Sequence, residues 1–224
     1  MKTIAHIYTD FSTKFGLPRQ SGLIEEIKGR IIFEKEYRSP EAFRGLEDFS
    51  HIWLLWQFSE SVRENWSPTV RPPLLGGNTR MGVFATRSPF RPNPIGLSCV
   101  KLEKIEYSKA DGPVLYVSGC DLMNGTPIYD IKPYLPYADS VPQATGGFTT
   151  ALDERKLEVD ISDELLKNVP EQRRKTLLAV LAGDPRPSYQ NDPERIYGFG
   201  FAGLEIKFTV SDRKITVIAV IPEN

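Results

Sequence analysis

Histidine and cysteine are scarce in this chain of 224 residues, which has two of each. A structural zinc site takes four ligands, usually cysteine and histidine at close spacing. Neither the cysteines, Cys99 and Cys120, nor the histidines, His6 and His51, offer such a spacing. With so few histidines, a Ser-His-Asp arrangement is also disfavoured. The sequence therefore predicts no bound metal and two reduced thiols.

Long apolar runs are missing as well. The N-terminus, Met1 to His6, lacks the apolar segment of a signal peptide. No stretch approaches the roughly 20 apolar residues that a membrane span needs. Apolar content of 40% and charged content of 25% are those of an ordinary globular protein. We therefore expect a cytoplasmic protein without a membrane partner.

The common cofactor and nucleophile motifs are absent too. No G-x-G-x-x-G follows a strand into a helix, and the chain has no P-loop. It also lacks the G-x-S-x-G elbow of the α/β-hydrolases. A Rossmann-type nucleotide site is therefore not expected.

Acidic residues are absent from Asn65 to Lys101, although the net charge of the whole chain is only −1. A local excess of one sign attracts phosphate even in a neutral chain. A set of solvated arginines without a partner is the simpler alternative. The cations of this window are Arg71, Arg80, Arg87, Arg91 and Lys101.

The same window contains a proline-rich stretch, Gly82 to Ser98. It begins as an expected strand, Val83–Thr86, and its three prolines between residues 89 and 94 exclude a helix. Arg87 and Arg91 lie in this stiff segment without an acidic neighbour in the sequence. A rigid cationic loop suits anion or nucleotide binding, whereas a proline-stiffened surface turn is the alternative.

Short apolar runs separated by turn residues predict a mainly β protein. Successive strands with almost no helix between them favour an all-β barrel or sandwich. After a glycine-bearing linker at residues 143–150, the pattern predicts a helix at Pro170–Ala182 and a hairpin. We therefore expect a β domain at residues 1–142 and a smaller α+β domain at 151–224. The strands expected in the first domain are Ile4–Tyr8, Gly29–Phe33, Phe49–Phe58, Val83–Thr86, Leu97–Tyr107, Val114–Val117 and Ile128–Ile131.

Four blocks of the sequence resemble the TsaA-like family, also named TrmO. They are Pro18-Arg19-Gln20, Phe49 to Trp53, Gly82 to Ser98 and Asp130 to Pro136, in that order. The resemblance spans residues 4–139, and Asp184 to Tyr189 is similar to the bacterial C-terminal extension of the family. Because several blocks occur in the right order, the match is more specific than any single motif.

The resemblance implies a small β-barrel, unlike a Rossmann fold, that binds S-adenosylmethionine and forms a homodimer. It also implies methylation of N6 of threonylcarbamoyladenosine beside the anticodon of threonine tRNA. The competing interpretation is an RNA-binding β-barrel module without catalysis, which the cationic loop fits equally well.

The resemblance implies a cofactor site. The assignment of Arg87 to this site is supported both by the family motif and by the local positive charge. Ser59-Glu60 differ from the more His/Gln-like pair expected in relatives, so contact there is expected through the backbone. The expected cofactor-binding residues are Pro18, Arg19, Gln20, Phe58, Ser59, Arg87, Leu97, Asp121, Leu122, Met123 and Asn124.

Methyl transfer from a sulfonium requires alignment, and a ureido N6–H also benefits from a nearby base. The catalytic candidates are Asp130, Lys132 and Tyr134 of the second motif, and the sequence does not decide which of them is the base. A turn or an ion pair with Lys132 is an equally good explanation of Asp130.

A tRNA partner is expected to bind through cationic and aromatic side chains. Some of them lie in the acid-free window and others in the C-terminal domain. Arg91 and Asn93 could instead shape the proline-rich loop. The expected tRNA-binding residues are Arg71, Arg80, Arg91, Asn93, Arg173, Arg174, Arg186 and Tyr189.

Overall fold

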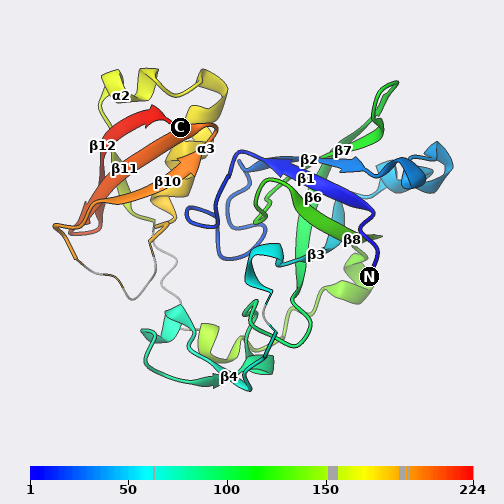
Figure 1. Cartoon of the computed structure of the whole chain (residues 1–224), viewed down its shortest axis with the longest axis horizontal. Coiled ribbons are helices and arrows are strands. Elements are labelled where there is room, and N and C mark those ends of the chain that lie inside the picture. Colours follow the sequence, from blue (N-terminus) through cyan, green and yellow to red (C-terminus); the bar gives the residue numbers. More distant parts are fainter. Residues whose placement is uncertain (63, 151–155, 187–189, 191, 224) are drawn as a thin grey trace.

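The computed structural model describes residues 1–62, 64–150, 156–186, 190 and 192–223. Its first part is a closed antiparallel barrel with the strand order β1-β2-β7-β6-β3-β8 (Figure 1). The expectation of a β-barrel is therefore confirmed. The barrel strands are β1 (Ala5–Thr9), β2 (Lys28–Phe33), β3 (His51–Gln57), β6 (Ile95–Ser108), β7 (Gly112–Ser118) and β8 (Thr126–Pro133).

Strand β3 shows why these segments close into a barrel. Its side chains alternate, so that Ile52, Leu54 and Trp56 are buried inside while the residues between them face outwards. Strand β3 pairs with β6 on one side and with β8 on the other. The aromatic run that predicted a buried strand therefore forms part of the barrel wall.

Between β3 and β6 the chain leaves the barrel and forms a lobe around strands β4 (Thr69–Val70) and β5 (Met81–Gly82), visible at the β4 label in Figure 1. The expected strand at Val83–Thr86 is wrong, because Val83–Ala85 form a 3₁₀ turn. The Thr86 N–H donates to the Val83 carbonyl, and the Val83 N–H donates to the Pro68 carbonyl. These bonds close the turn and leave no ladder for a strand.

The second part is a four-stranded sheet with the order β10-β11-β12-β9 and two helices. Helix α3 buries Leu177, Val180 and Leu181, and Ser162 caps α2 by accepting a hydrogen bond from the Leu165 N–H. The expected helix and hairpin are confirmed, whereas β9 and β10 were not expected. The elements are β9 (Glu158–Asp160), α2 (Asp163–Lys167), α3 (Glu171–Ala182), β10 (Tyr197–Phe201), β11 (Leu204–Ser211) and β12 (Lys214–Pro222). We call residues 156–223 the C-terminal unit.

The remaining described elements are short. A one-turn helix, α1 (Pro136–Asp139), follows β8. The 3₁₀ turns are Lys35–Tyr37, Pro40–Phe43, Leu46–Asp48, Ser59–Ser61, Pro73–Leu75, Val83–Ala85 and Gly147–Thr149. Among the described residues, no helix is long and apolar enough to cross a membrane.

One hydrophobic core runs through both parts of the chain. It includes barrel residues such as Ile7 and Leu54 together with Leu177 and Phe208 of the C-terminal unit. The two parts meet through the β1–β2 loop, residues 10–27, where the Phe11 and Phe201 rings lie 5.4 Å apart in an edge-on arrangement. The C-terminal unit is therefore packed against the first part of the chain.

Candidate functional site

The candidate site lies where strands β6 and β7 separate. Their ladder ends at the pair Lys101–Ser118, and within the described strands β6 continues to Ile95 paired with β3 alone. A register shift at Glu103 precedes the separation. The unpaired edge of β6 therefore presents backbone donors and acceptors that other segments can use.

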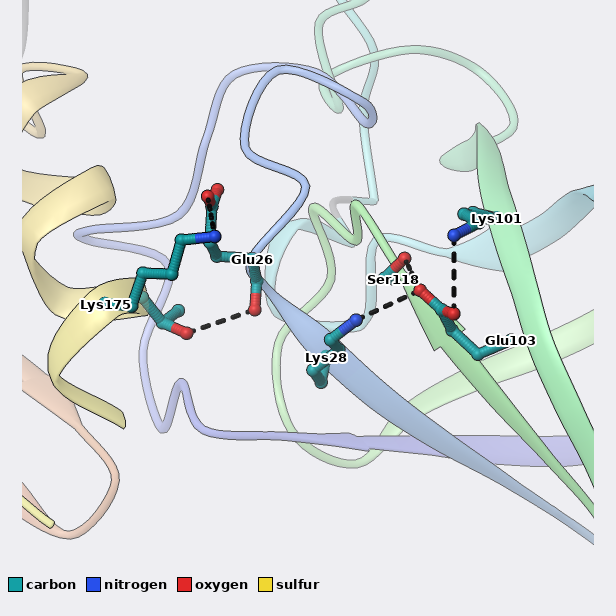
Figure 2. Close-up of polar contacts among 7 residues, drawn as sticks. Glu26, Lys28, Lys101, Glu103, Ser118 and Lys175 are labelled. Carbon is teal, nitrogen blue, oxygen red and sulfur yellow. Dashed lines mark hydrogen bonds and ion pairs between the residues drawn. The ribbon is translucent and has the colours of Figure 1, made fainter. Parts of the chain in front are cut away.

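A charged cluster ties three strands together beside this separation. The Glu103 carboxylate accepts hydrogen bonds from the Ser118 hydroxyl at 2.6 Å and from the Lys28 ammonium at 3.0 Å (Figure 2). The hydrogen bond from Ser118, followed by that from Lys28, lowers the pKa of Glu103 to about 2. Lys101 adds a third contact at 3.4 Å. The carboxylate thus joins β2, β6 and β7 where the ladder ends.

The loop that carries Pro18-Arg19-Gln20 docks on the unpaired edge of β6. The Cys99 N–H donates to Ser21 Oγ at 3.1 Å, which occupies one edge donor. Next along the loop, the Gly22 N–H donates to the Gly119 carbonyl at 2.9 Å. These two bonds fix the predicted cofactor motif against β6 and the end of β7.

A buried hydrogen-bonded chain leads from the barrel interior to Asp121. The Trp56 indole N–H donates to Ser98 Oγ at 2.9 Å, and the Ser98 hydroxyl donates to Asp121 Oδ1 at 2.6 Å. Ser98 is fully buried. Burial raises the pKa of Asp121, while the Ser98 hydrogen bond and the charge of Arg87 act in the opposite direction. The carboxylate is therefore fixed in position within an environment that penalises its charge.

Arg87 brings the opposite charge to the same place. Its guanidinium donates to the Gln20 side-chain oxygen, and it interacts electrostatically with Asp121. The sequence around Arg87 contains no acidic residue, but the fold supplies one from the β7–β8 turn. Gln20, Arg87 and Asp121, which are far apart in the sequence, thus form one polar cluster.

An apolar wall adjoins the polar cluster at the end of β3. The Phe58 N–H donates to the Pro94 carbonyl at 2.9 Å, and the Phe58 ring lies 4.3 Å from that of Trp56. Leu97 is 51% exposed on the outer face of β6, and Ser59 is exposed in the next turn. The expected residues Phe58, Ser59 and Leu97 therefore lie around the same stretch of β6 as the Asp121 chain.

The residues of the turn Asp121 to Asn124 have two different roles, one in the polar cluster and one in attaching the turn to β1. Leu122 is fully buried in the core, and its carbonyl accepts a hydrogen bond from the Thr9 hydroxyl at 3.1 Å. Asn124 accepts from the Thr9 N–H at 3.2 Å and donates its own N–H to the Phe11 carbonyl. Asp121 joins the polar cluster, whereas Leu122 and Asn124 fasten the turn to β1.

The second motif lies on the outer face of the barrel. Asp130 and Lys132 form an ion pair at 3.0 Å, with side chains that are 46% and 63% exposed, which is the alternative that the sequence left open. The Tyr134 ring lies 5.8 Å from that of Trp53. In the ladder Asp130 stands opposite Leu55, and Leu55 stands opposite Leu97. The motif therefore shares the outer face with Leu97 but does not join the buried Asp121 chain.

The structure adds three residues that the sequence argument missed: Ser21, Trp56 and Ser98. Ser98 carried a readable signal, since a serine stands between Gly96 and Val100 at an inward position of an apolar strand. Such a position predicts a buried hydrogen-bond partner. Within the described residues, no group of three His, Cys, Asp or Glu side chains could hold a metal ion.

Two family descriptions match the chain. Residues 6–140 match the tRNA-methyltransferase O N-terminal domain, and residues 154–223 match the TrmO C-terminal domain. The chain belongs to the TrmO family. The family resemblance of the sequence blocks is thereby confirmed.

Individual TrmO relatives match along most of their length. One from Escherichia coli (strain K12), named tRNA (adenine(37)-N6)-methyltransferase, is 40% identical over 227 residues, or 98% of this chain and 96% of the relative. One from Eikenella corrodens, with the same name, is 46% identical over 77% of this chain and 97% of the relative. A crystal structure of TrmO from Pseudomonas aeruginosa matches with a TM-score of 0.78 at 33% identity, covering 98% of this chain and 96% of the other.

Four of the eight expected tRNA-binding residues are held within the chain by ion pairs or by backbone carbonyls. Arg91 donates to the Thr86 and Ser88 carbonyls at 3.1 and 3.4 Å, so it shapes the proline-rich loop. The remaining three lie in the C-terminal unit. Arg173 pairs with Asp10 at 2.9 Å, Arg174 donates to the Val169 carbonyl at 3.0 Å, and Arg186 forms two bonds of 2.9 Å with Asp184.

The remaining expected tRNA contacts are Arg71, Arg80, Asn93 and Tyr189. The first three are exposed, and Arg80 also donates to Thr69 Oγ1 at 3.0 Å. Tyr189 lies outside the described residues. Arg71 and Arg80 extend from the β4–β5 lobe, so the structure places two of the expected cations in one exposed region.

Proposed function

We propose that this protein is an S-adenosylmethionine-dependent methyltransferase that modifies N6 of adenosine 37 in tRNA. The observation that carries the proposal is the cluster of Arg87, Gln20 and Asp121 at the unpaired edge of β6. In finer detail, we propose threonylcarbamoyladenosine beside the anticodon of threonine tRNA as the substrate. The names of the Escherichia coli and Eikenella corrodens relatives support the adenosine-37 assignment.

The residues of the cluster fit the methionine part of S-adenosylmethionine. That part carries a carboxylate and an ammonium group on one carbon, so it needs opposite charges close together. Arg87 would bind the carboxylate and Asp121 the ammonium group, while Phe58 and Leu97 supply apolar surface. Bound S-adenosylmethionine supplies an electrophilic methyl group, and the chain supplies alignment, which can lower a barrier by up to roughly 7–11 kcal/mol.

Asp130 is the residue of the second motif that we propose as the proton acceptor for the N6–H group. Its side chain is accessible on the outer face that it shares with Leu97, so a substrate arriving from solvent can reach it. Lys132 holds the carboxylate through the ion pair, and Tyr134 adds an aromatic surface. A base in hydrogen-bond reach contributes about 10²–10⁴-fold to the rate.

The β4–β5 lobe is the surface that we propose for tRNA. Trp66 and Phe84 are 53% and 73% exposed and stack with their ring centroids 6.3 Å apart. Arg71 and Arg80 are exposed on the same lobe, within the window that lacks acidic residues. Exposed aromatic rings beside cations suit unpaired bases and phosphates of an anticodon arm.

The division into domains at 1–142 and 151–224 and a homodimer are parts of the same proposal. The family matches at 6–140 and 154–223 support the division. Tyr137 and Val141, which follow β8, are exposed apolar side chains that a partner copy could cover.

Two matched arginine variants test the assignment of the sites. Arg87→Ala should weaken S-adenosylmethionine binding by about tenfold or more, because charge-assisted bonds to a carboxylate are strong. Arg71→Ala should leave that affinity unchanged and weaken tRNA binding. Calorimetry with S-adenosylmethionine and a tRNA filter-binding assay measure the two effects. If a folded Arg87→Ala variant bound S-adenosylmethionine like the wild type, the proposed cofactor site would be wrong.

A non-catalytic RNA-binding module is the second candidate, favoured by the exposed lobe alone. It leaves the buried chain of Trp56, Ser98 and Asp121 without a use. A wild-type protein that binds tRNA but gives no calorimetric signal with S-adenosylmethionine would favour this module.

A further inference from the structure

The β1–β2 loop, residues 10–27, carries Pro18-Arg19-Gln20 but makes many of its contacts with the C-terminal unit. At its start, the Asp10 carboxylate pairs with Arg173 of α3 at 2.9 Å, and the Asp10 carbonyl accepts the Ala202 N–H at 2.7 Å. The Ser12 hydroxyl donates to the Glu223 carboxylate at 2.8 Å. The C-terminal unit therefore holds both the backbone and the side chains at the start of the loop.

The middle of the loop fits closely against the sheet of the C-terminal unit. Gly16 has a φ of +96° and lies against the Phe199 ring, so that an added Cβ atom would stand 2.5 Å from Phe199 Cδ2. No side chain larger than hydrogen fits there without movement. The loop thus passes over β10 at close range just before Pro18.

The end of the loop is held by helix α3. The Thr176 hydroxyl donates to the Glu26 carbonyl at 3.1 Å, and the Lys175 ammonium lies 3.3 Å from the Glu26 carboxylate (Figure 2). Figure 2 also shows the contact between Lys28 and Glu103. Glu26 is therefore held by the C-terminal unit, whereas Lys28, two residues later, is held by the barrel. Thr176 is buried, which makes its hydrogen bond part of the packed interface.

We propose that the C-terminal unit is a positioning element for the cofactor site: it holds the loop on both sides of Pro18-Arg19-Gln20 in the geometry that binds S-adenosylmethionine. The inference rests on the proposed function. If the loop is already ordered before binding, little conformational entropy is lost when the ligand binds, and the affinity is higher. The affinity therefore depends on how firmly the loop is held. The unit therefore acts on the methyl donor in addition to any contact with tRNA.

Thr176→Val tests the proposal, because valine keeps the shape of threonine and removes only the hydroxyl that holds Glu26. Thr209→Val is the matched control, since Thr209 lies on the opposite face of β11 from the buried Phe208. We expect Thr176→Val to raise the Kd and the KM for S-adenosylmethionine about fivefold, the usual effect of one lost hydrogen bond. The kcat at saturating S-adenosylmethionine should not change, and the control should behave like the wild type.

Hydrogen–deuterium exchange of the amides in residues 17–23, measured without ligand, provides an independent readout. Faster exchange there in Thr176→Val than in Thr209→Val supports positioning. If Thr176→Val lowers the Tm but leaves both the affinity and the exchange of this segment unchanged, the interface is merely structural and the proposal is overturned.

The exchange experiment also separates this inference from the proposed function. If the wild type does not bind S-adenosylmethionine, the proposed function fails, while the exchange rates still decide whether α3 holds the loop. Should Thr176→Val not fold, Lys175→Ala replaces it, because that side chain is 85% exposed and its loss is tolerated more easily. Unchanged exchange of residues 17–23 in Lys175→Ala would then overturn the proposal.

Discussion

Asp121 is a carboxylate that the fold retains at a cost. Burial disfavours its charge and raises its pKa, although the Ser98 hydroxyl at 2.6 Å, the backbone hydrogen bonds of Asp121 and Ser21 and the charge of Arg87 offset part of this effect. A structure selected for stability alone would place a neutral side chain here. The cost is explained if the charge of Asp121, together with that of Arg87, receives a zwitterionic ligand.

Asp121→Asn separates stability from ligand binding, because the Asn oxygen still accepts the Ser98 hydrogen bond. Since the pKa of Asp121 is raised in the folded chain, the wild type loses stability as the pH rises through that pKa. The variant should lack this loss and be unchanged or up to about 1 kcal/mol more stable at pH 7. Thermal unfolding between pH 3 and pH 8 measures the difference.

The same variant should bind S-adenosylmethionine about tenfold more weakly, because it loses a charged partner for an ammonium group. Calorimetry at pH 7 measures this effect. Wild-type affinity in Asp121→Asn would show that the buried carboxylate serves the fold and does not contact the ligand.

At the scale of single elements, the separated half of β6 organises the site. Gly96 allows the Trp56 side chain to cross the strand, since an added Cβ atom would stand 2.2 Å from Trp56 Cε2. Trp56 in turn donates to Ser98, and Ser98 donates to Asp121. The position of the indole ring therefore affects the position of the Asp121 carboxylate through two hydrogen bonds.

Gly96→Ala should displace Trp56 and destabilise the protein by about 1–3 kcal/mol, as overpacking does in other cores. It should also weaken S-adenosylmethionine binding, because the displaced indole releases Ser98. Gly82→Ala is the control: nothing lies within 4 Å of its added Cβ atom, and its φ is −57°. Chemical unfolding and calorimetry on both variants measure the effects. Equal stability of the two would contradict the proposed packing at Gly96.

The sequence predicted the elements better than their contacts. The short apolar and aromatic run of β3 and the alternation of apolar and polar residues in β6 could be read locally, because both patterns are typical of strands. The turn at Val83–Ala85 could not, because three apolar residues followed by a threonine do not reveal whether a partner strand exists. Strand β10 was missed since Gly198 and Gly200 interrupt its apolar pattern.

The candidate site was predictable to a similar extent. Family motifs pointed to Gln20 and Arg87, and the turn that begins at Asp121 was a further candidate; the fold brings the three residues together. The hydrogen bond between Trp56 and Ser98 joins residues 42 positions apart, and no local pattern encodes such a contact. Arg173 and Arg186 were expected to bind tRNA from their charge. The partner of Arg186, Asp184, is close in the sequence, whereas Asp10, the partner of Arg173, is distant and became visible only in three dimensions.

At the scale of the whole molecule, the proposed cofactor site, the proposed tRNA surface and the support of the β1–β2 loop lie in three different parts of the fold. The barrel carries the proposed cofactor site, the β4–β5 lobe carries exposed aromatic rings and arginines, and the C-terminal unit holds the β1–β2 loop. A net charge of −1 conceals this arrangement, because the acid-free window is balanced by acidic residues elsewhere. Only a substrate that spans the lobe and the barrel uses both surfaces, and a tRNA anticodon arm is large enough.

The most direct test is methyl transfer to tRNA, followed by mass spectrometry of the digested nucleosides. With S-adenosylmethionine and tRNA that carries threonylcarbamoyladenosine, the wild type should add one methyl group at N6 of adenosine 37, and Arg87→Ala should show a large loss of rate at limiting S-adenosylmethionine. No methylated nucleoside from a folded wild type that binds both ligands, or methylation at another position, would contradict the account.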